Sequence, residues 1–229
     1  MRSGDMKRWL LSVRGIFLKD VRSELRTRYA VSALVMFVIT TIAIILFSLA
    51  HEAAPPEVLS GMLWVVIFFG AMSGLSRTFV MEEERGTAMT LQLLAPPSAV
   101  YFGKLLFNVV LVVALNAFTV ILYLLLVAGF VVRSADVFAL TMLLGSLGFA
   151  SAATIIAAII ARANTKGTLY PVLSFPILLP LLVVVIDATR SATEGAPLAE
   201  AGGAFQFLIS YIVVLTTLSY LLFEYIWKD

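Results

Sequence analysis

The 229-residue sequence has no cysteine and a single histidine, His51. Without cysteine the chain can form no disulfide, thiolate metal site or cysteine nucleophile, and its redox compartment stays undetermined. One histidine without a partner at ligand spacing does not make a metal site. We expect His51 to be a solvated loop residue. The alternative is a contact to haem, which proteins commonly hold through an axial histidine.

Charge is also scarce, since Asp, Glu, Lys and Arg make up 13% of the chain, about half the usual share in soluble domains. Each long stretch without charge approaches or exceeds the roughly 20 residues that cross about 30 Å of hydrocarbon. Lipid-exposed backbone must pair within its own segment, and the alternation of a β-barrel is absent. The sequence therefore predicts an all-α integral membrane protein with six transmembrane helices, approximately 31–50, 58–76, 105–130, 137–161, 167–186 and 204–224.

The predicted spans lack the groups that catalysis or ion coupling would need. They contain no Ser–His pair, paired aspartates or H-E-x-x-H motif, so we do not expect an enzyme. Their strongest polar groups are amides and hydroxyls such as Asn108, Asn116 and Ser174. Ionisable residues inside spans usually mark proton or ion relays. Their absence from the span cores argues against a proton-coupled secondary transporter.

No nucleotide-binding loop is present either. A P-loop requires G-x-x-x-x-G-K-[ST], in which glycine backbone and lysine hold the phosphates. Lys104 follows Gly103, but Ser98 stands where the first glycine belongs and Leu105 where the hydroxyl belongs. Any driven work would therefore take its energy from another chain.

The basic residues predict the orientation of the chain. Fourteen of the sixteen lysines and arginines fall in residues 1–30, in the connections 77–104 and 162–166, or in the C-terminal tail. Six spans place these regions on one side of the membrane, and lysine and arginine favour the cytoplasm. We therefore expect both termini to be cytoplasmic. Topology explains the basic excess, so nucleic-acid binding is not implied.

Residues 1–30 are too polar to cross the bilayer, but they have helical periodicity. Their apolar stripe and their basic side chains fall on roughly opposite sides of a helix. This pattern predicts a cytoplasmic interfacial amphipathic helix with Trp9 as its interface anchor. The alternative is a basic tail that only sets orientation. The stripe consists of Leu10, Val13, Phe17 and Val21, and the basic side of Arg8, Lys19, Arg22 and Arg26.

Two patterns inside the spans bear on packing and movement. Gly70 and Gly74 have the G-x-x-x-G spacing that lets membrane helices approach closely. Pro171, Pro176 and Pro180 each remove a backbone donor, so they predict a bent or locally opened helix over 167–186. That helix is either a mobile, cavity-lining element of a transport cycle or a static kink that packing accommodates.

The segment 81–98, MEEERGTAMTLQLLAPPS, interrupts the apolar pattern on the predicted cytoplasmic side. Gly86 is expected to end one helix, and Thr87 or Thr90 to cap a short second helix. Ala88, Leu91 and Ala95 would share one face of it, with Leu94 beside them. The helix would stop at Pro96–Pro97, Ser98 would cap the next helix, and Lys104 would snorkel to the interface. Such a transverse helix suits docking to a cytoplasmic partner.

The chain resembles the CcmB family, the haem exporter B subunit of cytochrome c maturation. The resemblance lies in an acidic run, Gly, a leucine-rich turn, Pro and then Lys. The resemblance covers essentially the whole chain. The long basic N-terminus departs from the family pattern and looks like an extension. The matching stretches are LSRTFVMEEERGTAMTLQLLAPPSAVYFGKLL, GMLWVVIFFGAMSGLSRTF, LTMLLGSLGFASAATIIAAI and LSFPILLPLLVVVIDA.

The resemblance implies an ABC-2-like permease domain over 31–229 in the bacterial inner membrane. Its expected partners are a cytoplasmic ATPase that binds ATP, a haem-handling membrane subunit, a periplasmic haem chaperone and the lipid bilayer. Haem is the molecule the complex handles, and the chain itself is expected to bind no cofactor. The alternatives are a permease for polysaccharide, lipid or drug, and a passive assembly scaffold. The residues expected to dock the ATPase are Glu82, Glu83, Glu84, Arg85, Gly86, Leu91, Leu94 and Pro96.

Overall fold

A computed structural model describes residues 3–27, 29–49, 54–75, 77–84, 86–162 and 169–228. Over these ranges the secondary structure is helical, with short connections and no strand. The helices are α1 (Ser3–Thr27), α2 (Tyr29–Ser48), α3 (Pro56–Leu75), α4 (Arg77–Glu84), α5 (Ala88–Leu94), α6 (Pro97–Leu126), α7 (Ala135–Arg162), α8 (Leu169–Glu194) and α9 (Gly202–Lys228).

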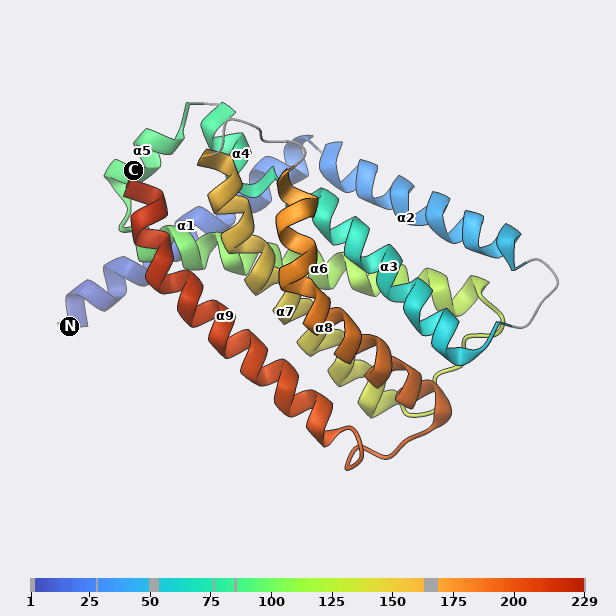
Figure 1. Cartoon of the computed structure of the whole chain (residues 1–229). Coiled ribbons are helices and arrows are strands. Elements are labelled where there is room, and N and C mark those ends of the chain that lie inside the picture. Colours follow the sequence, from blue (N-terminus) through green and yellow to red (C-terminus); the bar gives the residue numbers. More distant parts are fainter. Residues whose placement is uncertain are drawn as a thin grey trace.

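Six helices are long and apolar enough to span a membrane, which confirms the predicted membrane fold. They are α2, α3, α6, α7, α8 and α9, with the α3 candidate continuing into α4. In Figure 1 they form a bundle with both chain ends at the end where α4 and α5 lie. We call this the α5 end. The helix α1 runs across the bundle near this end instead of along the spans.

The helix α7 occupies the centre of the bundle. Within its span 78% of the residues are buried, against 17% in α2 and 11% in α9. Glycines allow the close approach: a Cβ at Gly145 would lie 2.5 Å from the Trp64 ring of α3, and one at Gly148 would lie 2.2 Å from Leu181 of α8. In lipid, packing of this kind replaces the hydrophobic effect as the force that holds helices together.

Gly70 and Gly74 lie where α3 meets two neighbouring helices. A Cβ at Gly70 would lie 3.2 Å from Leu115 of α6, and one at Gly74 would lie 2.9 Å from Leu34 of α2. The G-x-x-x-G pair therefore faces helix contacts inside the chain.

The helix α8 extends beyond the expected span of 167–186. The helix continues to Glu194 because Ala188 and Ala192 stay buried and the Trp64 indole donates to the Thr189 hydroxyl (2.8 Å). Arg190 also forms ion pairs with Asp187 and Glu194, which lie one turn before and one turn after it on α8.

The three prolines of α8 are not equivalent. Pro171 lies in the first turn, where a missing backbone N–H costs no helical hydrogen bond, so only Pro176 and Pro180 interrupt the ladder. The Tyr211 hydroxyl of α9 donates to the Ile177 carbonyl (2.8 Å), between these two prolines. A neighbouring helix therefore adds a hydrogen bond to the segment between the two prolines.

We expect Gly145→Ala to destabilise the fold, because the added methyl group would meet a Trp64 ring that its bond to Thr189 holds in place. Overpacking of this kind costs about 1–3 kcal/mol. The measurement is the melting temperature of the purified protein in detergent. Gly61→Ala is the matched control, since no atom lies within 4 Å of its added Cβ. Equal melting temperatures for the two variants would contradict this account of α7 packing.

Candidate functional site

The connection between α4 and α5 is shaped by Gly86. Its φ of 66° is in the left-handed region, which glycine adopts without steric cost. The Thr87 N–H then donates to the Glu82 carbonyl (2.9 Å), closing the turn. The expected helix break at Gly86 and the short helix after it are confirmed.

Two expected caps are wrong. Thr87 stands at the N-cap of α5, but its hydroxyl donates to the Glu82 carboxylate (2.6 Å) and does not cap the helix. The cap position of α6 belongs to Pro96, and Ser98 instead accepts a hydrogen bond from the Trp9 indole (3.0 Å). Both hydroxyls thus bind side chains outside their own helix, Thr87 a residue of the preceding helix and Ser98 one that is 89 positions away.

The helix α5 has an inward and an outward face. Ala88 and Ala95 are buried and Leu91 packs half-buried against the core, as their spacing predicted. The Gln92 amide donates to the Trp227 carbonyl near the end of α9 (2.6 Å), which fastens the helix to the bundle.

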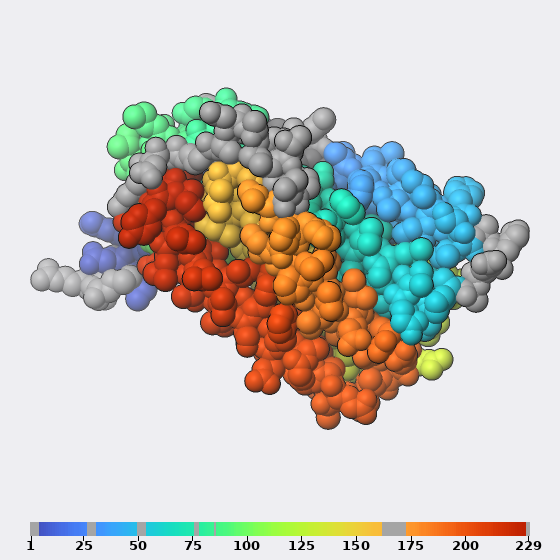
Figure 2. Space-filling view, in the orientation of Figure 1, coloured from blue at the N-terminus to red at the C-terminus, as the bar shows by residue number. Residues whose placement is uncertain are grey.

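The outward face of α5 is apolar. Met89, Leu93 and Leu94 are 72%, 82% and 76% exposed. In the space-filling view the α4–α5 segment, in green, forms the edge of the molecule at the α5 end (Figure 2). We call these three residues the α5 patch.

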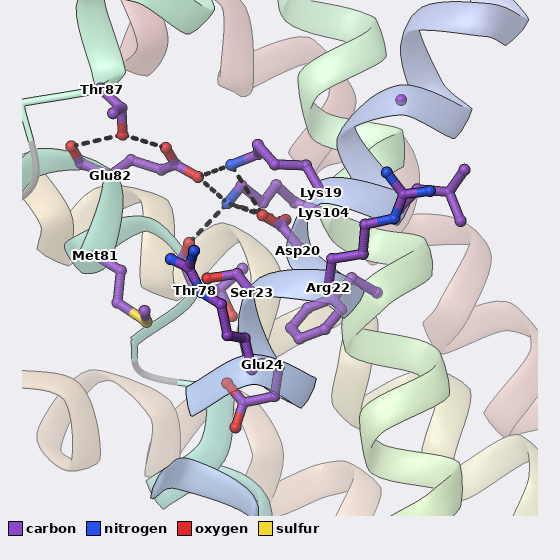
Figure 3. Close-up of a pocket in the computed structure, with 14 residues that line it drawn as sticks. Lys19, Asp20, Arg22, Ser23, Glu24, Thr78, Met81, Glu82, Thr87 and Lys104 are labelled. Carbon is purple, nitrogen blue, oxygen red and sulfur yellow. Dashed lines mark hydrogen bonds and ion pairs between the residues drawn. The ribbon is translucent and has the colours of Figure 1, made fainter. Parts of the chain in front are cut away.

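Beneath this segment Lys104 of α6 is buried, with 1% of its surface exposed. Its ammonium group lies 3.0 Å from an Asp20 carboxylate oxygen of α1 and 2.8 Å from one of Glu82 of α4. It also donates to the Thr78 carbonyl (3.0 Å). Figure 3 shows these groups converging, with Lys19 of α1 bonded to the same Glu82 oxygen. We call Lys19, Asp20, Glu82 and Lys104 the ion cluster.

The expectation that Lys104 would snorkel to the membrane interface is therefore wrong. Lysine snorkels when its stem lies along lipid, whereas this stem is enclosed by α1 and α4. The neighbouring Gly103 permits the approach of α1: a Cβ there would lie 2.8 Å from Ile16 and 3.1 Å from the Val13 carbonyl oxygen.

The position of α1 corrects the predicted apolar stripe in part. Ile16 and Asp20 are buried, while of the stripe residues Val13, Phe17 and Val21 are half-buried and Leu10 is exposed. Trp9 contacts Phe102 of α6 edge to face at 5.6 Å, so it anchors α1 to the protein. The helix packs along α6 because Gly103 and Lys104 offer a close surface and a charge.

Two cations and two anions make the ion cluster electrically neutral. Burial favours the uncharged amine of Lys19, but the Asp20 and Glu82 carboxylates outweigh burial and raise the pKa of Lys19 above its ordinary value. The cluster borders a cavity of about 570 Å³, which Arg22 and Glu24 of α1 also line. Removing one partner of a buried ion pair lowers the stability of the fold by about 3–5 kcal/mol, because the other charge is left buried and uncompensated.

Hydrogen bonds continue from the ion cluster into the bundle. The Thr78 hydroxyl donates to the Asn108 amide oxygen (2.8 Å), and the Asn108 amide nitrogen donates to the Thr154 hydroxyl of α7 (2.8 Å). A continuous path of hydrogen bonds therefore joins α4 to the central helix through the Asn108 side chain. From the sequence, Asn108 could be identified only as one of the strongest polar groups in the spans.

The structure separates the residues expected to dock the ATPase. Glu82 is buried and held by ion pairs, and Leu91 is half-buried against the core. Glu83 is half-buried, and the exposed members are Glu84, Gly86, Leu94 and Pro96. Arg85 and His51 lie outside the described residues.

Sequence reasoning missed Met89 and Leu93 of the α5 patch and the role of Asp20. The sequence signal for Asp20 was its position as an aspartate on the apolar side of an otherwise basic helix. Across the described residues no group of three histidines, aspartates or glutamates could hold a metal ion.

We expect Glu82→Gln to destabilise the chain by about 3–5 kcal/mol, because it removes one of the two anions beside buried Lys104. The melting temperature of the purified protein measures this loss. Lys104→Met in the same chain should recover part of it, since the uncompensated charge is gone. Glu84→Gln, an exposed neighbour, should leave the melting temperature unchanged. An equal loss in Glu82→Gln and Glu84→Gln would contradict the cluster.

The six helices that are long and apolar enough to span a membrane agree with the comparison to known families. Residues 11–224 match the CcmB protein family. No curated protein matches the chain by sequence. The match covers nearly the whole chain, including all six spans, and so the chain belongs to the CcmB family, the haem-exporter membrane subunits of the cytochrome c maturation system.

Proposed function

We propose that this chain is a permease subunit whose α5 patch binds a separate cytoplasmic ATPase. The observation that carries the proposal is the exposure of Met89, Leu93 and Leu94 on a short helix beyond the spans, in a chain without a nucleotide-binding loop. The positive-inside distribution of charge supports a cytoplasmic position for this helix and for both termini. The corresponding membrane is the bacterial inner membrane.

The α5 patch has the composition of a docking surface. Fully burying a leucine or methionine side chain is worth about 1.5–3 kcal/mol, and clustered apolar exposure outside lipid marks an interaction site. Glu84, the exposed last residue of α4, would add a negative charge beside the docking helix. Charges at the rim of an interface affect the rate of association more than the affinity of the complex.

The attachment of α5 makes it suitable for passing on movement. Its N-terminal turn is bonded to Glu82, and Glu82 is tied through Lys104 to α1 and α6. The Thr78–Asn108–Thr154 path extends the connection to α7. A displacement imposed on α5 by nucleotide binding in the partner would therefore reach the central helix.

The output of this coupling would be haem delivery, or release of the haem-loaded chaperone, on the opposite side of the membrane. A haem-handling membrane subunit and a periplasmic haem chaperone are the further partners. The span cores offer amides and hydroxyls but no histidine or cysteine, two of the common axial ligands of haem. This favours a coupling role for the chain over direct ligation of haem.

We expect Leu93→Asp with Leu94→Asp to abolish co-purification of the ATPase and the formation of c-type cytochromes. Placing two carboxylates in an apolar contact would leave them desolvated and unpaired. Pull-down of the ATPase with the tagged chain and haem staining of cytochromes measure the two effects.

Leu198→Asp is the matched control, because it makes the same change at an exposed leucine in the turn between α8 and α9, at the other end of the bundle. It should retain ATPase binding. Normal binding in the α5 variant, or equal loss in both variants, would reject the α5 patch as the docking site.

We expect Asn108→Leu to retain ATPase binding but to lower cytochrome c formation several-fold. Without Asn108 the Thr78 hydroxyl can donate to the Leu75 carbonyl instead, and the Thr154 hydroxyl still donates to the Ala150 carbonyl, so neither hydroxyl would be left unpaired. Co-purification measures ATPase binding, the melting temperature measures folding, and cytochrome content measures the output of coupling, so the three together distinguish a coupling defect from a folding defect. Unchanged cytochrome content would show that the polar path does not carry the movement.

A further inference from the structure

A second cavity, of about 540 Å³, lies between α1, α6 and α9 at the α5 end. Neither the ion cluster nor the α5 patch contributes to it. The side chains that form it come from residues far apart in the sequence, among them Asp5, Arg8 and Trp9 of α1, Phe102 of α6 and Tyr220 of α9. We call it the α1 groove.

The wall of the α1 groove is aromatic and fixed. Trp9 meets Phe102 edge to face at 5.6 Å, and Phe102 contacts Tyr220 at 5.8 Å. The Trp9 indole is held by its hydrogen bond to Ser98. Tyr220 is 46% exposed on α9, whose span is only 11% buried, so this wall is continuous with a lipid-facing surface.

The rim of the groove carries one charge of each sign. Asp5 and Arg8 are three residues apart on α1, which places them on one face of the helix. Both are exposed, and neither forms an ion pair with another residue in the described parts of the chain. A carboxylate accepts hydrogen bonds from an ammonium group, and a guanidinium donates two to a phosphate.

The position of the groove selects the class of ligand. The helix α1 crosses the ends of the spans (Figure 1), and tryptophan and tyrosine favour the headgroup level. A molecule held here has its tails beside α9 and its polar part beside α1. We propose that the α1 groove binds one phosphatidylethanolamine, with its phosphate on Arg8, its ammonium on Asp5 and an acyl chain along Phe102 and Tyr220.

The pair of rim charges distinguishes this lipid from other phospholipids. The quaternary ammonium of phosphatidylcholine cannot donate a hydrogen bond to Asp5, and phosphatidylglycerol has no cation and brings its negative charge close to that carboxylate. The proposed site depends on the membrane fold and not on ATPase binding.

The test is native mass spectrometry of the purified full chain, delipidated and then titrated with each of the three phospholipids. We expect one retained phosphatidylethanolamine and roughly tenfold weaker retention of it by Arg8→Gln and by Asp5→Asn, about 1.4 kcal/mol each. Arg14→Gln, an exposed basic residue of the same helix outside the groove, is the matched control and should bind normally.

The lipid titration should also raise the melting temperature of the unmodified chain and of Arg14→Gln, with little effect on the two groove variants. Equal retention of phosphatidylcholine, or preference for phosphatidylglycerol, would overturn the proposal. So would loss of binding in Arg8→Gln alone, because Asp5 would then have no part in recognition.

Discussion

The buried ammonium group of Lys104 is the interaction on which the α5 end of the molecule depends. It holds carboxylates from α1 and α4 within 3.0 Å and a backbone carbonyl at the same distance. A lysine taken out of water needs this number of partners, because desolvation otherwise exceeds the attraction. The three helices must therefore keep their places together, and α5, bonded to Glu82 through Thr87, keeps its place with them.

The ion cluster divides this acidic segment between the interior and the surface. Glu82 is buried and paired with Lys104, while Glu84 and the α5 patch are exposed. The helix α5 is bonded to Glu82, which connects it through Lys104 to α1 and α6, and Thr78 and Asn108 continue the hydrogen bonds to α7. The small residues of α7 bring α3 and α8 equally close, so the central helix is in contact with most of the bundle.

The N-terminal helix contributes to two places in the structure. Ile16 and Asp20 are buried against the bundle, while basic and apolar side chains such as Arg8 and Leu10 are exposed. The first turns of the same helix line the α1 groove.

The sequence by itself determined the six spans, because about 20 apolar residues can meet the backbone's hydrogen-bonding requirement in lipid only as a helix. It also determined the break at Gly86 and the stop at Pro96–Pro97, which are local backbone effects. Only the tertiary structure decided that Glu82 is buried and Glu84 exposed. These glutamates are equivalent in local sequence, and their environments depend on Lys104 and Asp20, which pair across 84 positions. Such a pairing follows from how helices distant in the chain pack, and no local pattern encodes it.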